Sequence, residues 1–539
     1  MIADVAVLKR LPRRLDVLTY DVPNELIVAR GDLVIVPFRS LEVYGIIVRA
    51  SHEHRQALKP IHAVVSRHFV SDEYLSVMER LAEDLVQSFS AVLYSSIVIP
   101  KKTSVFNAVE ANTEVLHRRS LKIRSSEIAF IREVVSMARD KVYLAGQVTD
   151  FTQVAAIIDG LRNGNGQLLV LVPHHHDGEA FSGVLGMPFF DTTLKPKIRA
   201  QLCEGWRTGV IKEMITTRLG ALLHAHNLER GIIVRSGSAE HVQYDRNPRY
   251  DAREVLASSC KRLLSLDVLP RLADMTKSEK TLFLPNELKA QTEVIDLKYE
   301  RGKEFFLLTV SLLTKTREAL QSGKNVLLFY NRKGISRALE CHDCGWISDN
   351  GKLTHEHCPN CQSLRLTQRG IGNQLVQKAL MRLIPDVPIL RSELGVKYED
   401  PHIPHIVLAT QYHLESVLDP FDLADIGLVA ELRADLGLLD TRYTALERLA
   451  QRLWLLRGIA WRAKAKFIVQ SFDAQLARRM LDEPERFLRD ELELRKRFLY
   501  PPFKNIYRVG GKLVRPNETE ILVLKEQPDS VIIERNPEL

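Results

Sequence analysis

Four cysteines stand in two closely spaced pairs, Cys341 with Cys344 and Cys358 with Cys361. A Cys-x-x-Cys turn directs two sulfurs toward one ion, and Gly345 lets the backbone curl around the first pair. Zinc prefers four soft ligands in a tetrahedron, so four thiolates close the shell and leave no open position for catalysis. The spacing therefore predicts one structural Zn²⁺ ion rather than a catalytic metal or two unrelated turns.

The other two cysteines, Cys203 and Cys260, stand alone, which argues against a disulfide framework and for a reducing compartment. The first residues contain no continuous apolar segment, and no stretch reaches the roughly 18 apolar residues of a membrane span. The sequence thus predicts a cytoplasmic protein that does not interact with a membrane.

Composition indicates a folded protein with a weak preference for acidic partners. Hydrophobic residues at 45% and charged residues at 26% are ordinary for a globular chain. Lysine and arginine outnumber aspartate and glutamate by 75 to 67, which gives a net charge of +8 over 539 residues. Nucleic acid is a natural partner for such a chain, but the charge alone does not decide the matter.

The elements that must position these residues change in kind along the chain. Up to about residue 101, short alternating runs such as DLVIVPF predict a small, half-exposed sheet followed by a helix. Residues 102–124 are polar and predict a linker. From 125 onward, buried strands such as LLVLVP alternate with helices, and this alternation restarts after 293, which predicts two parallel α/β lobes. A short sheet closes the chain after 503.

Several segments resemble the family of primosomal protein N′ (PriA) helicases, which restart stalled replication forks. The opening VAVLKRLPRRLDVLTYDVP resembles its domain for the 3′ end of DNA, and VLLFYNRKGISRALECHDCGW resembles its second lobe at the first zinc knuckle. ATQ at 409–411, ADLGL at 434–438 and ELELRKRFLYPPF at 491–503 follow in the family's order. Family members also carry a winged helix and eight zinc-binding cysteines, for which this chain has neither the linker length nor the cysteines.

The resemblance implies an α/β fold with two RecA-like helicase lobes. In front of them stands a small β-rich 3′ DNA-binding domain at residues 1–101, joined by a linker at 102–124. The first lobe, with a degenerate nucleotide loop, covers 125–292, and the second covers 293–482 with a zinc-binding insert at 341–361. A small α+β domain at 483–539 ends the chain.

Three parts of the family's ATPase site lack the residues that ATP and Mg²⁺ require. The turn matching the phosphate loop, Gly146 to Gln153, has one glycine and no lysine; Asp150 adds a negative charge there, and Phe151 crowds it. Where the family has acidic residues for magnesium, the chain has Arg235-Ser-Gly-Ser238. The family's arginine-bearing helix is replaced by residues 452–460, with Arg457 and Arg462 as possible substitutes. These losses disfavour catalysis, so no catalytic or nucleotide-binding residue is assigned.

For DNA, the resemblance implies contacts by Tyr20, Arg39 and Lys59. Lys59 matches the family's lysine, Arg39 stands at its glycine position, and Leu18-Thr19 replaces its aromatic and acidic pair beside Tyr20. Arg39 and Lys59 are expected to hold phosphates, and Tyr20 to stack on a base.

The leading hypothesis is a PriA-like scaffold that binds single-stranded or forked DNA in replication restart or recombination-linked replication, without hydrolysing ATP. Its partners would include primosomal proteins that restart replication and load the helicase. Two alternatives stay open at this point: an active 3′-5′ helicase with a divergent nucleotide site, and a protein-interaction relic with no DNA role.

Overall fold

The computed structural model describes residues 1–12, 15–52, 57–98, 121–162, 164–245, 248–300, 302, 305–331, 337–344, 356–370, 372–440, 442–509, 512–514 and 533–536. Most of the predicted linker, 102–124, and Gly345 lie outside these residues. Among the described helices, none combines the length and apolarity needed to cross a bilayer.

The N-terminal part is an antiparallel sheet backed by two helices, as the alternating pattern predicts. The strand order is β2-β1-β4-β3-β5, and valine and isoleucine side chains fill its core. Ser71 caps the first helix by accepting a hydrogen bond from the Tyr74 amide, because its hydroxyl suits an unpaired amide there. The elements are β1 Ile2–Val7, β2 Val17–Asp21, β3 Leu33–Phe38, β4 Leu41–Ser51, β5 Ala63–Ser66, α1 Asp72–Asp84 and α2 Phe89–Ser96.

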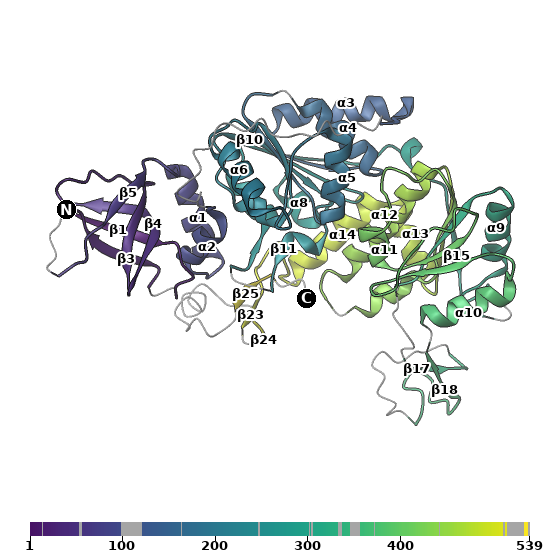
Figure 1. Ribbon diagram of the computed structural model, residues 1–539. Coiled ribbons are helices and arrows are strands. Elements are labelled where there is room, and N and C mark those ends of the chain that lie inside the picture. Colours follow the sequence, from purple (N-terminus) through teal and green to yellow (C-terminus); the bar gives the residue numbers. More distant parts are fainter. Residues whose placement is uncertain are drawn as a thin grey trace.

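The first lobe is a seven-stranded sheet in the order β14-β6-β13-β10-β7-β9-β8, and every strand pair in it is parallel. Its central strands, such as QLLVL of β7, carry buried apolar runs because helices cover both faces (Figure 1). The strands are β6 Tyr143–Gln147, β7 Gln167–Leu171, β8 Phe189–Phe190, β9 Glu213–Thr216, β10 Leu228–Val234, β13 Arg262–Asp267 and β14 Lys280–Leu282. The helices are α3 Ser125–Asp140, α4 Phe151–Leu161, α5 His175–Leu185, α6 Pro196–Arg207, α7 Ala252–Ser259 and α8 Leu272–Lys277, and a small hairpin pairs β11 Val242–Gln243 with β12 Tyr250–Asp251.

The second lobe repeats this plan with six parallel strands in the order β15-β22-β21-β16-β20-β19. The α/β fold with two parallel lobes is therefore confirmed. The strands are β15 Thr292–Asp296, β16 Asn325–Phe329, β19 Ile389–Ser392, β20 Ile406–Ala409, β21 Ile426–Glu431 and β22 Lys466–Ser471. The helices are α9 Val310–Gln321, α10 Asn373–Leu383, α11 Gln411–Ser416, α12 Ala445–Ala463 and α13 Ala474–Asp482. Helix α14 Pro484–Arg497 begins the predicted C-terminal domain, and its Phe487 and Leu488 join the same buried cluster as α12 and α13.

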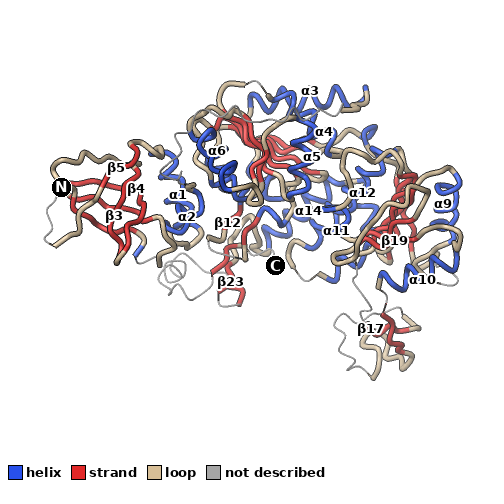
Figure 2. Tube along the Cα trace, in the orientation of Figure 1, coloured by secondary structure: helices blue, strands red, loops and turns tan. Residues whose placement is uncertain are grey.

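Two small sheets complete the molecule. The hairpin of β17 Arg337–Cys341 and β18 Leu366–Gly370 projects from the second lobe, as Figure 2 shows. The strands β23 Tyr507–Val509, β24 Lys512–Val514 and β25 Ile533–Arg535 form an antiparallel sheet that lies near the first lobe (Figure 1).

The two lobes share one apolar core. A single cluster of buried side chains runs from Phe151 and Phe181 of the first lobe to Phe329, Leu453 and Trp454 of the second. Apolar side chains of both lobes are therefore buried against one another at the interface between the lobes, where water does not reach them. This interface also contains the turn from Gly146 to Gln153, which matches the phosphate loop of the family.

Candidate functional site

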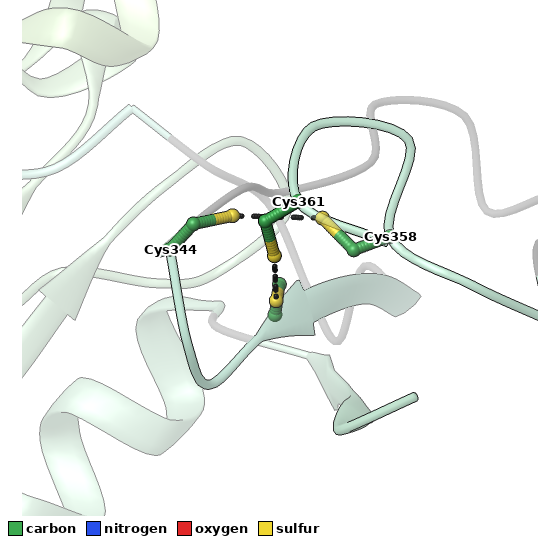
Figure 3. A group of neighbouring side chains, drawn as sticks. Cys344, Cys358 and Cys361 are labelled. Atoms are coloured by element: carbon green, nitrogen blue, oxygen red, sulfur yellow. Dashed lines mark hydrogen bonds between the residues drawn. The ribbon is translucent and has the colours of Figure 1, made fainter. Parts of the chain in front are cut away.

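The four predicted ligand cysteines converge on one point (Figure 3). The Sγ atoms of Cys341 and Cys361 are 3.5 Å apart, as are those of Cys344 and Cys358, and all four lie within 4.8 Å of one another. Four sulfurs around tetrahedral zinc, each at about 2.3 Å, would lie about 3.8 Å apart. The cluster therefore has the ligand type, number and spacing to hold one metal ion.

The hairpin explains why these cysteines meet. Cys341 ends β17 opposite Leu366 of β18, and the amide of His342 donates to the carbonyl of Arg365 at 3.0 Å. The second knuckle is closed by the Gln362 amide, which donates to the carbonyl of Cys358 at 2.8 Å. Asp343 of the first knuckle accepts a hydrogen bond of 2.6 Å from the Ser363 hydroxyl beside the second. Backbone pairing therefore brings together cysteines that are far apart in sequence.

The turn after β6, where the family binds phosphate, is filled by its own side chains. Only three residues, Val148, Thr149 and Asp150, separate β6 from α4. The Asp150 carboxylate accepts hydrogen bonds from the Thr152 amide at 2.7 Å and the Gln153 amide at 3.3 Å. The Thr149 amide donates to the Gln153 side chain at 2.8 Å. Amides that would cradle a phosphate in a glycine-rich loop therefore already have partners.

An arginine of the second lobe completes this turn. Arg462, at the end of α12, donates from Nε to Asp150 at 2.9 Å and from Nη2 to Glu127 of α3 at 2.6 Å. Burial lowers the pKa of Arg462, but the charges of Asp150 and Glu127 outweigh burial and raise it. Glu127 is fully buried. Sequence reasoning missed Glu127, because 335 residues separate it from Arg462 and no local pattern marks such a pair.

The other candidate arginine, Arg457, lies one turn earlier on α12 and does not reach the turn. Its Nε donates to the Ala290 carbonyl at 2.8 Å and its Nη1 to the Leu481 carbonyl at 2.7 Å, while the guanidinium lies over the Trp454 ring. Of the two possible substitutes, only Arg462 therefore stands where phosphates would lie.

The space beside the turn is closed as well. Gly458 of α12 packs against the Thr149 carbonyl so tightly that a Cβ atom at Gly458 would lie 1.9 Å from that oxygen. Phe151 is buried, with its ring centroid 5.0 Å from that of Phe181 and 6.3 Å from that of Phe421 in the second lobe. Helix α12 and these rings thus occupy the volume beside the turn.

The segment after β10, where the family has its magnesium-binding acids, presents a cation. Arg235 has a left-handed backbone with φ of 51°, and its guanidinium lies 5.9 Å from the centroid of the Phe151 ring. Its Nη1 is 3.9 Å from the carboxylate of Asp177, whose pKa is raised by burial. Next to it, the Gly237 amide donates to Asp267 at 2.6 Å. A guanidinium offers no lone pair to a metal ion.

Two of the three predicted DNA contacts lie side by side. Arg39 occupies the turn between β3 and β4, and Lys59 approaches it, with Nζ 3.5 Å from the Arg39 carbonyl oxygen. Both side chains are exposed, and among the described residues neither forms an ion pair with a carboxylate. Arg39 has φ of 55°, a region that favours glycine, which agrees with the glycine expected from the family resemblance. Two neighbouring exposed cations with no carboxylate partner in the described part of the chain can bind a phosphate.

Tyr20 occupies a different environment. It is 3% exposed, packs in the core of the N-terminal sheet, and donates from its hydroxyl to the Pro37 carbonyl at 3.1 Å. A base could stack on this ring only if the ring left the core. In this structure, therefore, Tyr20 supports the β3 strand beside Arg39 instead of presenting a stacking face.

A scan against protein families matches residues 5–98 to the 3′ DNA-binding domain of the PriA type. Among curated proteins, the chain is 24% identical over 310 residues to the replication restart protein PriA of Borreliella burgdorferi, a match covering 50% of this chain and 45% of that one. It is 23% identical to the PriA of Rickettsia typhi, covering 90% and 84%. The PriA of Thermotoga maritima is 26% identical, covering 59% and 49%. The chain thus spans about half the length of some of these relatives and most of others.

Two solved structures show remote similarity to this chain. RecG bound to a three-way DNA junction aligns with 84% of this chain and 56% of that one, at 13% identity and a TM-score of 0.38. Dbp5 of S. cerevisiae, bound to RNA and ADP BeF3, aligns with 69% of this chain and 98% of that one, at 9% identity and a TM-score of 0.36.

Proposed function

Because this chain belongs to the PriA family of replication restart proteins, we propose that it binds single-stranded or forked DNA as a scaffold and does not hydrolyse ATP. Its partners would be DNA and, by the same resemblance, proteins that restart replication and load the helicase. The N-terminal domain would contact DNA, and the two lobes would extend the binding face.

One observation carries the loss of hydrolysis: the Asp150 carboxylate accepts the amide hydrogens at the start of α4. A phosphate brought to the same place would meet a buried negative charge, and the amides of Thr149, Thr152 and Gln153 already have partners, so binding there is electrostatically disfavoured. Arg235 replaces the magnesium-binding acids, which removes the second requirement of phosphoryl transfer.

DNA binding would rest in part on the exposed pair of Arg39 and Lys59. Cations hold the phosphate backbone independently of base sequence, as a protein acting at any stalled fork requires. The four cysteine thiolates would be the ligands of one structural Zn²⁺ ion. Its hairpin projects from the second lobe (Figure 1), so zinc would stabilise this projection without entering the interlobe face.

The test compares ATP hydrolysis and DNA binding by the same preparation in the same buffer. We expect salt-dependent binding to forked DNA and no DNA-stimulated hydrolysis above the background measured without protein. DNA-stimulated turnover by the parent protein would contradict the scaffold, and a lack of binding at low salt would contradict the DNA role. An active PriA assayed in parallel verifies that the forked substrate stimulates turnover.

A further inference from the structure

The contacts between the lobes gather around the turn that precedes α4. Arg462 joins Asp150 and Glu127, and Arg124 at the start of α3 donates to the carbonyls of Trp461 and Arg462 at 2.7 and 2.9 Å. Farther along α12, the Glu447 carboxylate accepts from the Leu272 amide of α8 at 2.8 Å. Helix α12 of the second lobe is thus fixed to three segments of the first lobe.

We propose that Asp150 and Arg462 form a built-in latch, in which the carboxylate stands in place of a nucleotide phosphate and holds the two lobes closed. The inference rests on the proposed function and deepens it, since it explains how a scaffold without ATP keeps one shape. It identifies Asp150 as an internal ligand of the interlobe face, with Arg462 as its receptor.

The chemistry of the turn supports this substitution. The start of an α-helix favours a negative charge, because its amide hydrogens are unpaired and the helix dipole is positive there. Asp150 supplies that charge at the start of α4, an eleven-residue helix, and the same carboxylate accepts from Arg462 across the interface. A bound phosphate would make the same two kinds of contact, with helix amides on one side and a guanidinium on the other.

Packing seals the latch against water. Asp150 and Arg462 have side chains that are 6% and 10% exposed, and Glu127 is completely buried. The T-shaped pair of Phe181 and Phe421, with centroids 5.3 Å apart, continues the seal from the first lobe to the second. A charge-assisted hydrogen bond in such surroundings is stronger than one in water. The closed arrangement therefore needs no ligand, and any DNA-binding face that spans both lobes is permanent.

Single-molecule energy transfer would test the latch without nucleotide or DNA. Dyes attached through noncanonical residues at exposed Lys197 of α6 and Lys378 of α10 report the distance between the lobes. We expect one population for the parent protein. Asp150→Asn keeps a side chain that caps helices well but removes the charge. We expect it to raise the open-to-closed ratio about tenfold or more, as losing a hydrogen bond between charged groups would.

Glu229→Gln is the matched control, because Glu229 of β10 has a side chain that is 15% exposed and pairs with Lys261 at 3.1 Å inside the first lobe. It should destabilise that lobe and leave the distance distribution unchanged. Equal opening by Glu229→Gln and Asp150→Asn, or no opening by either, would overturn the latch. Because the assay contains neither ATP nor DNA, such a result would leave the proposed function standing.

Inorganic phosphate provides the second arm. In Asp150→Ala the helix start loses its anion and Arg462 keeps only Glu127 as a carboxylate partner. Added phosphate should therefore restore the closed population, whereas chloride at equal ionic strength should not. The parent should not respond, since Asp150 already fills the place. If phosphate does not restore the closed population of Asp150→Ala, or shifts the parent as much as it shifts Asp150→Ala, the carboxylate does not take the place of a phosphate.

Discussion

The cysteine cluster and the interlobe turn are both dense groups of polar side chains, but they balance charge in different ways. At the turn, the carboxylates of Asp150 and Glu127 face the guanidinium of Arg462 and lie near that of Arg124, so the group supplies its own counter-charges. In the cysteine cluster four sulfurs face one another, and as thiolates they repel unless a cation lies between them. A self-balanced cluster displaces a ligand, whereas an unbalanced cluster requires one.

The largest expected effect comes from breaking the unbalanced cluster. Cys358→Ser should reduce bound zinc from about one ion per chain to nearly none, because structural zinc in small domains contributes about 10–16 kcal/mol that depends on the full ligand set. Elemental analysis of the purified protein measures this change. The isolated Cys260 gives the control, and Cys260→Ser should retain zinc. Zinc retained by Cys358→Ser would show that the cluster does not act as a four-ligand site.

The next effect tests how tightly the self-balanced cluster is packed. Gly458→Ala places a Cβ atom against the Thr149 carbonyl oxygen, so either α12 or the turn must move. We expect unfolding free energy to fall by about 1–3 kcal/mol, the usual cost of overpacking, as measured by urea denaturation.

Gly183→Ala serves as the control for this substitution. Gly183 lies within α5, and a Cβ atom there would meet nothing within 4 Å. Alanine should therefore be neutral or stabilising, by up to about 1 kcal/mol. Equal effects at the two glycines would show that the interface around Thr149 is looser than the structure indicates.

Sequence reasoning succeeded where local pattern decides structure. Buried apolar runs between helices predicted three strands of the first lobe, β6, β7 and β10, and the described strands of the second lobe except β19. Only a sheet covered on both faces buries such runs. The cysteine spacing predicted the cluster for the same reason, because each knuckle is a local turn. That Asp150 opposes phosphate stays a prediction.

What it missed depends on long-range packing. Nothing near Glu127 in the sequence marks it as the partner of Arg462. The sequence around Tyr20 likewise does not distinguish a ring that stacks on a base from a ring that packs in the core. Its burial follows from the register of β1 against β2, which pairs Ala3 with Tyr20. Register and interlobe contacts are properties of the assembled chain, so single-residue patterns do not contain them.

His224 differs from both clusters because it is buried in its uncharged form, at the contact between the N-terminal domain and the first lobe. Its Nε2 accepts from the Ser71 amide at 3.3 Å and its ring lies 4.8 Å from that of Tyr74. Burial, with smaller contributions from Arg207 and His226, lowers the pKa of His224 to about 4.

This depressed pKa predicts acid sensitivity. Below about pH 6.5 the unfolded chain binds a proton that the folded chain excludes, so stability is lost as pH falls from about 6.5 toward 4. At pH 5, His224 alone should lower the free energy of unfolding by about 2 kcal/mol relative to pH 7.5. His224→Gln should reduce the difference between urea midpoints at these pH values, and His402→Gln, at an exposed site, should not. An unchanged difference in His224→Gln would contradict the buried, neutral state.

The smallest effect concerns the exposed cations Arg39 and Lys59, which resemble the cysteine cluster in lacking counter-charges among the described residues. Lys59→Ala should weaken binding to forked DNA about three- to tenfold and reduce the salt dependence of log K by about 0.9 per lost phosphate contact. Fluorescence anisotropy across a salt series measures both.

Arg39→Gly should weaken DNA binding by a similar factor. It should change the free energy of unfolding by no more than about 1 kcal/mol, because glycine removes the backbone strain of a left-handed φ but makes the unfolded chain more flexible. Arg39→Lys, which keeps the charge, should bind nearly as well as the parent. If all three variants bind forked DNA as tightly as the parent at every salt concentration, the DNA lies elsewhere on the molecule. A pair of surface cations without counter-charges would then not by itself identify a ligand site.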